Sequence, residues 1–147
     1  MRKLLAPLAV AAAVFGFGAA PASAATKPVL FTYVYVDSPG TDNRTNASLN
    51  QEYFRLTNQL AKPVGLKNWS VRDAAGKVIT FGNITLPAKG TFVVHTGKGT
   101  QGSPAGHFYW NSGNYIWNNT GDTATLRSPS GATMDTCTWK KVSTTKC

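Results

Sequence analysis

The stretch of sequence that decides the fold is residues 116–126, which read IWNNTGDTATL. A Trp leads into a polar turn of Asn, Thr, Gly and Asp, and the alternating residues that follow the turn are typical of a β-strand. A second turn at residues 128–131 (SPSG) and an apolar strand from Met134 to Trp139 complete the unit. It contains no combination of acid, base and nucleophile, so it indicates a fold rather than a chemistry.

The same alternation of strand and turn signals recurs upstream of residue 116. Strands are expected at residues 29–36, 53–57, 66–71, 78–81 and 92–96, with short extended pieces at 107–110 and 115–117. Clusters of turn-forming residues separate them at intervals of roughly 8–12 residues, and residues 41–50 are polar enough to form a surface loop. No window after residue 24 places apolar residues at helical spacing over three turns. We therefore expect a single all-β domain.

The first 24 residues have the anatomy of a secretory signal. Arg2 and Lys3 supply a positive start, residues 4–20 are apolar and uncharged, and residues 21–24 (PASA) end in an Ala-x-Ala cleavage site. The alternative is an uncleaved membrane anchor, but the run is rich in Ala and lies directly before the small-residue site. We expect residues 1–24 to be a signal peptide and residues 25–147 to be one secreted, extracellular domain.

The net charge of the chain is +9, from 15 Lys and Arg against six Asp and Glu. Loss of Arg2 and Lys3 with the signal would leave a net charge of +7 on the secreted part. The positive residues are scattered singly along the sequence, without a basic block. Such a charge favours solubility and loose attraction to polyanions, and does not by itself identify a nucleic-acid site.

Two cysteines, Cys137 and Cys147, lie close to the C-terminal end. In an exported protein an even pair of cysteines indicates a disulfide, which here would tie the tail back onto the last strand. The alternative is two free thiols. A metal site built from cysteines alone would need more of them.

Four fragments follow the motifs of one known family. Residues 50–58 (NQEYFRLTN) look like its opening strand, residues 66–73 (LKNWSVRD) like a hairpin, residues 86–90 (LPAKG) like a turn, and residues 117–126 like its W-x-N-x-G-D-x-A-x-L signature. From about residue 29 to residue 139 the chain thus resembles the lamin tail domain. One departure is Asn68, which occupies a position before the Trp where the family often has Gly.

The resemblance implies an immunoglobulin-like antiparallel β-sandwich that acts as a non-catalytic module. In nuclear lamins this domain is an interaction surface for proteins and, more weakly, for DNA, and the expected signal peptide points to an exported, stand-alone bacterial version. The signature residues that the resemblance picks out are Asn50, Glu52, Trp69, Asp73, Gly76, Trp117, Asn119, Gly121 and Asp122. We interpret them as structural: the Trp side chains should pack in the core with their indole N–H groups hydrogen-bonded, and the Asn, Gly and Asp residues should form turns.

Residues 97–102 (GKGTQG) fit the pattern G-x-G-x-x-G and follow an expected strand. A dinucleotide site also requires a helix at this point and a parallel βαβ unit. Residues 103–106 (SPAG) cannot continue such a helix, so we expect a flexible connector and assign no cofactor.

Two further groups of residues raise the question of a metal ion. His95 and His107 are the two histidines of the chain, and we interpret them as packing or surface residues because no third ligand stands at metal-binding spacing. Oxygen ligands suited to calcium gather at Asp37, Asp42, Asn43, Asn46 and Glu52. Their spacing is not that of an EF-hand, so a turn-rich loop is the preferred interpretation, and we assign no metal ligand.

The chain has more aromatic residues than a core of this size obviously needs. Some of them could be exposed as a platform on which sugar rings or bases stack. The candidates for this platform are Tyr33, Tyr35, Tyr53, Trp110, Tyr115 and Trp139.

Three functions follow from these patterns. The first is a secreted, non-catalytic binding module that docks on a protein or a cell-envelope polymer. The second is an extracellular nucleic-acid-binding domain that uses dispersed positive charge and exposed aromatic residues. The third is a small hydrolase, for which Glu52 and Asp135 are the carboxylates that could be nominated. We expect the first, with no catalytic residue.

Overall fold

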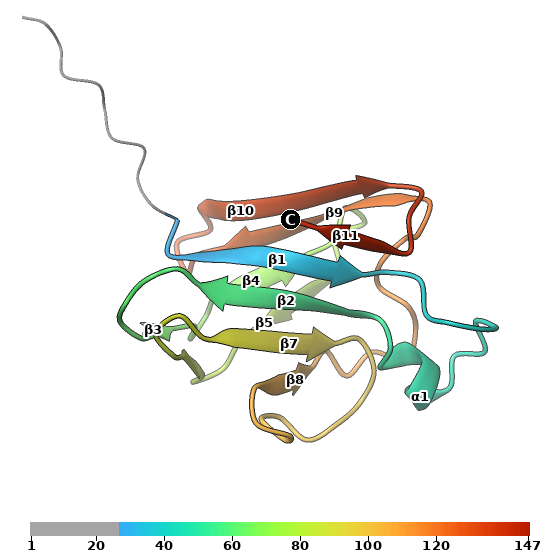
Figure 1. Cartoon of the computed structure of the whole chain (residues 1–147), viewed down its shortest axis with the longest axis horizontal. Helices are drawn as coiled ribbons and strands as arrows, with labels where there is room; N and C mark the ends of the chain where they lie inside the picture. Colours follow the sequence, from blue (N-terminus) through green and yellow to red (C-terminus); the bar gives the residue numbers. More distant parts are fainter. Residues whose placement is uncertain (1–26) are drawn as a thin grey trace, which may run out of the picture.

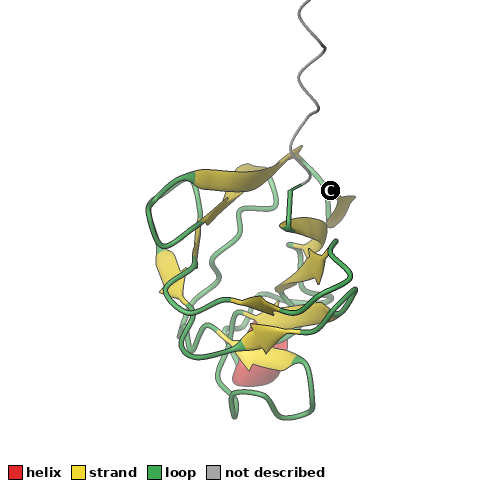
Figure 2. Cartoon of the chain, turned by 90° about the vertical axis from the view of Figure 1, so that its left-hand side faces the viewer, coloured by secondary structure: helices red, strands yellow, loops and turns green. Residues whose placement is uncertain are grey.

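Residues 27–147, which a computed structural model describes, form two facing β-sheets with one short helix at the edge (Figure 1). The expected signal peptide lies outside the described residues. In the end-on view the strands surround an interior that the core side chains fill (Figure 2). No helix within the described part of the chain is long and apolar enough to cross a membrane.

The larger sheet has five strands in the order β11-β1-β2-β7-β8. Their bounds are Val29–Tyr35 for β1, Tyr53–Asn58 for β2, Thr91–His95 for β7, His107–Tyr109 for β8 and Thr144–Lys146 for β11. The pairs are antiparallel except for β7 and β8, which run parallel. A parallel pair needs a longer connection than a hairpin, and residues 96–106 provide it.

The smaller sheet has four antiparallel strands in the order β10-β9-β4-β5. Their bounds are Ser70–Arg72 for β4, Val78–Thr80 for β5, Gly121–Arg127 for β9 and Thr133–Lys140 for β10. Two short strands, β3 (Val64–Gly65) and β6 (Thr85–Leu86), pair with each other separately. The expectation of an all-β sandwich is confirmed, with one parallel pair added to an otherwise antiparallel pattern.

The core lies between the two sheets and follows from the alternation along each strand. In β2, Phe54 and Leu56 are buried while Arg55 points outward, as the sequence pattern predicts. Trp117 is the aromatic centre of the core: its ring meets the rings of Phe54, Trp110 and Trp139 edge to face, at centroid distances of 5.6–5.8 Å. Burial of one such large side chain stabilises the fold by about 1.5–3 kcal/mol.

One local prediction is wrong. Residues 41–50 are not only a loop, because they include α1 (Asn46–Leu49), whose N-cap Thr45 accepts a hydrogen bond from the backbone of Ser48. One helical turn is too short to leave a periodic signal in the sequence. Residues 115–117, expected as a short extended piece, do not pair with a strand: the amides of Ile116 and Trp117 donate to the side chain of Glu52.

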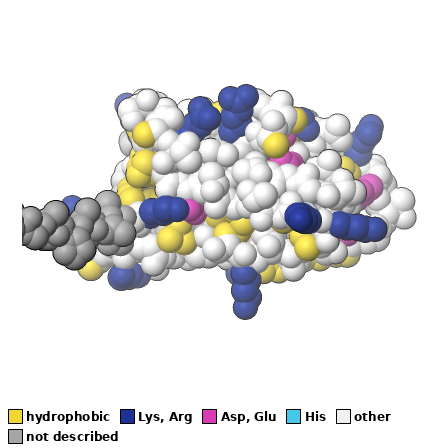
Figure 3. Space-filling model, turned by 90° about the horizontal axis from the view of Figure 1, so that it is seen from above, with side chains coloured by type: hydrophobic (Ala, Val, Ile, Leu, Met, Phe, Trp, Pro, Cys, Tyr) yellow, Lys and Arg dark blue, Asp and Glu magenta, His cyan; other side chains and the backbone are white. Residues whose placement is uncertain are grey.

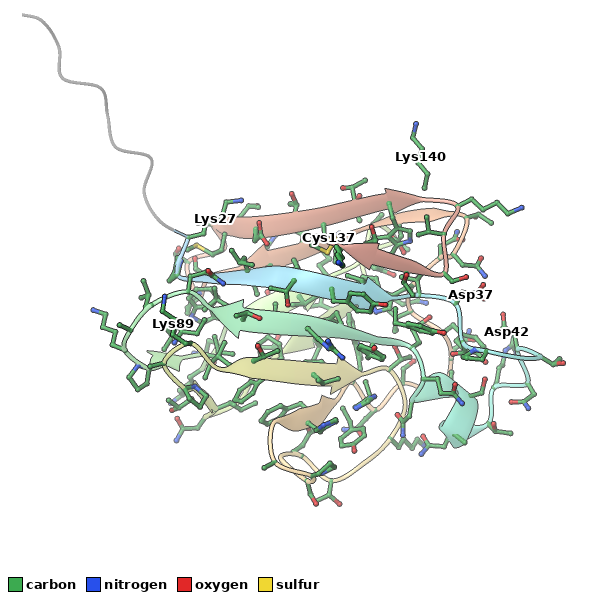
Figure 4. The ribbon with its side chains drawn as sticks, viewed as in Figure 1. Lys27, Asp37, Asp42, Lys89, Cys137 and Lys140 are labelled. Carbon is green, nitrogen blue, oxygen red and sulfur yellow. A yellow bond between two sulfur atoms is a disulfide. The ribbon has the colours of Figure 1, made fainter. Side chains whose placement is uncertain are left out.

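The predicted disulfide between Cys137 and Cys147 is confirmed, with a Cα–Cα distance of 5.5 Å. Cys137 belongs to β10 in the smaller sheet, and Cys147 follows β11 at the edge of the larger one (Figure 4). The tail is therefore tied to β10 as expected, but its strand β11 pairs with β1 of the opposite sheet. The bond holds the two sheets together along this edge.

Removal of the disulfide by a Cys137→Ser and Cys147→Ser double substitution should lower the free energy of unfolding by about 2–3 kcal/mol, because the bond closes a loop of the unfolded chain. Denaturant unfolding with and without reductant measures the effect, and the amides of β11 should exchange faster in the variant. The oxidised wild-type protein is the control: reductant should destabilise it and leave the variant unchanged. Equal stability of the two oxidised samples would contradict the prediction.

Candidate functional site

Glu52 is the residue around which one end of the sandwich is organised. It stands one position before β2 and continues the inward alternation of Phe54 and Leu56, so its side chain enters the interior and is fully buried. Its backbone carbonyl accepts a hydrogen bond from the amide of Thr96 at 2.9 Å, which extends the pairing of β2 and β7 by one residue pair. The sequence thus places a carboxyl group where an apolar side chain would be expected.

The Glu52 carboxyl connects three segments of the chain. Its Oε1 accepts hydrogen bonds from the Thr96 hydroxyl at 2.6 Å, from the Ile116 amide at 2.8 Å and from the Trp117 amide at 3.3 Å. Its Oε2 is buried and has no hydrogen-bond partner among the described residues. Desolvation by burial raises the pKa of Glu52 to about 7, against these three hydrogen bonds and the charge of Lys77, which lower it.

Two aspartates fix the turns beside Glu52. Asp122 Oδ1 accepts hydrogen bonds from the Ala74 amide at 3.0 Å and from the Thr123 amide at 2.7 Å. Asp122 Oδ2 accepts a hydrogen bond from the Asn118 amide at 3.1 Å. Asp73 Oδ1 accepts from the Lys77 amide at 2.6 Å. The turn after β4 and the turn before β9 are therefore held against each other by carboxylates that receive backbone N–H groups.

The remaining signature residues lie in turns and in the core around this end. Gly76 and Gly121 adopt φ values of +94° and +142°, which a side chain would make costly. Asn119 Nδ2 donates to Asp37 Oδ1 at 3.0 Å, and Asn50 Nδ2 donates to the Lys98 carbonyl at 3.0 Å.

The two signature Trp residues are both buried. Asn68, directly before Trp69, has a φ of +64°, and Asn tolerates this left-handed conformation better than most residues other than Gly. The departure from the family pattern at this position is thereby explained. The expectation for Trp117 is wrong in one respect: its indole N–H is buried without a hydrogen-bond partner among the described residues.

The G-x-G-x-x-G segment is a connector between β7 and β8, as expected. A Cβ on Gly97 would lie 2.5 Å from Asn50 Oδ1 and 2.7 Å from Asn46 Oδ1. Gly97 therefore permits the close approach of α1, whose Asn46 side chain bonds to both the amide and the carbonyl of Lys98. Its role in the structure is packing.

The Glu52 end of the sandwich has an open surface hollow of about 420 Å³, which we name the acidic hollow. Its lining includes Asp42, Glu52, Asp73, Lys77, Tyr115, Trp117, Asn118 and Asp122. Lys77 Nζ donates to the Tyr115 carbonyl at 3.0 Å. The hollow thus gathers four of the six acidic residues of the chain around one Lys.

The calcium ligands considered from the sequence do not converge here. Asp42 and Glu52 line the acidic hollow, but Asp37 bonds to Asn119 and Ser143, and Asn46 bonds to Lys98. Asp37 and Asp42 lie toward the same end of the molecule without forming one ligand set (Figure 4). Within residues 27–147, no three Asp, Glu, His or Cys side chains are close enough to hold a metal ion.

A second feature is the outer surface of the larger sheet, where aromatic and cationic side chains stand next to one another on adjacent strands. We name it the aromatic face. It consists of Tyr33, Tyr35, Tyr53, Arg55, His95, His107 and Tyr109.

The side chains of the aromatic face stack across the strands. Tyr53 stacks on Tyr35 at 5.6 Å and on Tyr33 at 6.1 Å, and the guanidinium of Arg55 lies 5.3 and 5.5 Å from the ring centres of Tyr33 and Tyr53. His95 continues the row toward β8, 5.1 Å from His107 and 5.2 Å from Tyr109.

The two histidines of this face are joined by a hydrogen bond between His95 Nε2 and His107 Nδ1 at 2.8 Å. His95 Nδ1 lies 2.6 Å from the carbonyl oxygen of Asn50. Desolvation by burial lowers the pKa of His95, which favours a neutral ring at physiological pH. The pair is therefore a stacked, hydrogen-bonded part of the surface.

Only part of the aromatic face was predicted from the sequence. Three predicted platform residues, Tyr33, Tyr35 and Tyr53, belong to it and are half-buried, whereas Trp139 is in the core and Trp110 packs against the core. Tyr115 lies away from this face and shares a hydrogen bond of 2.6 Å with Ser48. The contribution of β8 depends on its parallel pairing with β7, for which no sequence signal was recognised.

The two carboxylates considered for a hydrolase are not brought together. Asp135 accepts from the Phe31 amide and from Lys27, both at 2.8 Å, close to the start of β1. Glu52 precedes Tyr53, which pairs with Tyr35 at the other end of β1. The two groups therefore lie at opposite ends of the sandwich.

The raised pKa of Glu52 predicts a specific pH dependence of stability. The folded protein binds the Glu52 proton up to about pH 7 and the unfolded chain only up to about pH 4.5, so this group stabilises the fold at low pH. Relative to a Glu52→Gln variant, the wild-type protein should lose about 2–3 kcal/mol of unfolding free energy between pH 5 and pH 8.

Urea unfolding of both proteins at the two pH values measures this difference. Other titrating groups are shared, so they cancel in the comparison of wild type with variant. If wild type and variant differ in unfolding free energy by the same amount at pH 5 and at pH 8, then the pKa of Glu52 is not raised by folding.

Comparison with known proteins agrees with this architecture. Residues 22–141 match the family described as Lamin Tail Domain, and a search of the curated proteins found no match. The family is an immunoglobulin-like, non-catalytic interaction module. Because the match covers most of the chain, the protein belongs to the lamin tail domain family.

Proposed function

We propose that this protein is a secreted, non-catalytic interaction module that docks on a protein or a cell-envelope polymer. The observation that carries the proposal is the aromatic face. Its side chains come from four neighbouring strands, which are spaced about 4.8 Å apart, and so form a broad and rigid surface. Tyr and Arg side chains dominate the energetic centres of protein interfaces, and aromatic groups also contact the rings of polymers.

The charge of this face favours an acidic partner. Arg55 is exposed, rests on two Tyr rings and has no carboxylate partner among the described residues. Lys146 stands opposite Tyr33 in the β11–β1 pairing, so it is directed to the same side of the sheet. No Asp or Glu of the described chain is among the outward residues of this sheet.

Elsewhere the positive charge is dispersed. Figure 3 shows Lys and Arg side chains spread over the visible surface of the molecule. Loose attraction of polyanions to such a surface would be unspecific. An acidic group that binds at the aromatic face would instead contact the guanidinium of Arg55, which the rings of Tyr33 and Tyr53 hold in place.

Secretion is supported by the leader sequence and by the disulfide, which belongs to an oxidising compartment. Protein recovered from the medium of producing cells should have the mass of residues 25–147 minus the two hydrogen atoms lost on disulfide formation. Intact mass measurement tests both points. Retention of the full-length chain inside cells would argue against secretion.

Docking through the aromatic face is tested by retention on envelope extracts. The Arg55→Ala variant should retain its captured component about tenfold less well, because loss of a charged contact costs about 1.5–3 kcal/mol. Lys140→Ala is the matched control, since Lys140 is exposed on β10 of the other sheet and points away from the molecule (Figure 4). Equal retention of the wild type and the Arg55 variant would refute the assignment of this face.

Nucleic acid is the second candidate, favoured by the stacking of Arg55 on the rings of Tyr33 and Tyr53. Single-stranded DNA would then replace the envelope component in the same test. Its affinity should fall steeply as salt rises and should depend on Arg55. Weak binding that is indifferent to the Arg55 substitution would be a generic effect of net charge.

A further inference from the structure

The two sides of the sandwich, where the sheets end, are closed differently. On one side the disulfide joins β10 of the smaller sheet to the residue that follows β11 of the larger sheet. At their other ends the sheets finish with β5 and β8, and β8 lies at the far side of the molecule from β10 and β11 (Figure 1). There, residues 79–84, Gln101 and Phe108 line a hollow of about 350 Å³, which we name the apolar hollow. It shares no residue with the acidic hollow or with the aromatic face.

The lining of the apolar hollow includes core side chains that no further strand covers. Phe81 and Phe108 are buried, whereas Ile79 and Ile84 are only half-buried although they pack against the core. The rim at residues 82–83 is exposed, so the hollow opens to solvent. Apolar surface that remains in contact with water favours a ligand that covers it.

The edge of β5 beside this hollow has backbone groups without a neighbouring strand. Hydrogen bonds toward β4 and its ends are made by the Lys77 carbonyl, which accepts at 3.1 Å, and by the Phe81 amide, which donates at 2.8 Å. Since hydrogen bonding alternates along an antiparallel pair, Ile79 also bonds to β4, and the N–H and C=O groups of Val78 and Thr80 face the free edge. Both of these residues are exposed, and Val78, at 47 %, is the single exposed large apolar side chain of the described residues.

The edge of β8, across the hollow, is covered by its own connector. The side-chain amide of Gln101 donates to the Tyr109 carbonyl at 2.8 Å and accepts from the Tyr109 amide at 3.0 Å. The His107 carbonyl accepts from the Gly102 amide at 2.8 Å, and the His107 amide donates to the Pro104 carbonyl at 3.0 Å. Of the two strand edges at the apolar hollow, the one that can receive another strand is therefore that of β5.

Exposed cations stand at both ends of β5. Lys77 precedes the strand, and Arg72 pairs with its first residue. Lys67 lies beside the other end, because the next amide in the chain donates to the carbonyl of Phe81. None of the three cations forms an ion pair with a carboxylate among the described residues, and the nearby Asp73 is buried and accepts from the Lys77 amide. The edge therefore favours a segment that carries acidic residues.

We propose that β5 is a docking edge for an extended segment of a partner protein, which adds to the smaller sheet as a fifth strand and places an aliphatic side chain in the apolar hollow. The main chain of the segment bonds to the free N–H and C=O groups of Val78 and Thr80. Every second side chain of an added strand points inward, beside Ile79, and so enters the hollow. Acidic residues toward the ends of the segment lie near Lys67 and Arg72. This contact is separate from docking through the aromatic face and does not rest on it.

The probe is a phage-displayed library of random octapeptides, selected on the whole oxidised protein. We expect selected peptides to carry an aliphatic residue with Asp or Glu toward the ends, and replacement of the aliphatic residue by Ala should weaken binding about tenfold. Synthetic copies are then N-methylated at alternate amides, in two series. One series should bind about tenfold more weakly and the other should bind normally, because only every second amide of an added strand faces β5. Binding should also slow hydrogen exchange of the Val78 and Thr80 amides.

Two variants test the edge and the hollow separately. Thr80→Pro removes an N–H that faces the free edge and none that bonds to β4, and it should weaken peptide binding about tenfold. Gly82→Asp places a charge in the lining of the hollow, where an added Cβ would meet no atom within 4 Å, and it should have a similar effect. Gly113→Asp is the matched control, because the Cβ has equal room there and the position lies outside the lining; it should bind like the wild type.

Three results would overturn the proposal. They are equal binding of the two N-methylated series, equal binding of the selected peptides to Gly82→Asp and the wild type, and a library that yields no specific peptide. In the last case, a dimer of the free protein in sedimentation would assign the edge to a second copy. Should Thr80→Pro fail to fold, the N-methylated peptides still decide the question on the wild-type protein. Arg55→Ala should bind the peptides like the wild type, so a failure of docking through the aromatic face and a failure of this proposal are distinct results.

Discussion

The structure depends on one buried carboxyl group. Glu52 enters the interior at the start of β2, and a single oxygen of its side chain receives the Thr96 hydroxyl and the amides of Ile116 and Trp117. These contacts fix the segment that crosses from the larger sheet to the smaller one, and with it the position of Trp117 at the centre of the aromatic core. An apolar residue in place of Glu52 would leave two buried amides without a hydrogen-bond acceptor. The free-energy cost of these two unpaired amides exceeds the cost of burying the carboxyl group, because the carboxyl group can bind a proton and become neutral.

The same arrangement separates the charges of the molecule. Four of the six acidic residues line the hollow beside Glu52, and the outward residues of the larger sheet carry Arg55 and Lys146 without an acid among those described. The two surfaces therefore differ in the sign of the charge that they carry, positive on the aromatic face and negative in the acidic hollow. The disulfide fixes β11, which carries Lys146, to the rest of the sandwich.

Much of the fold could be predicted from the sequence, because alternation is a local property. Phe54 and Leu56 inside and Arg55 outside follow from the period of a strand, and the pairing of Cys137 with Cys147 follows from the presence of two cysteines and from the expectation of export. The candidate sites were less predictable, because they depend on contacts between distant segments. That His107 and Tyr109 join the aromatic face follows from a parallel strand pair, and that Glu52 keeps one oxygen unpaired follows from three donors that converge on the other. The single turn of α1 was missed because it is stabilised by its cap and by burial of Leu49, without any periodic pattern.

The account is tested most directly by the protonation of Glu52 itself. The ¹³C resonance of its side-chain carboxyl, assigned by comparison with the Glu52→Gln variant, can be followed by NMR over a range of pH. Desolvation by burial, opposed by three hydrogen bonds, predicts a titration midpoint of about 7. A midpoint at the ordinary value of 4.5 would show that the carboxyl is hydrated, and would contradict a structure that is organised around its burial.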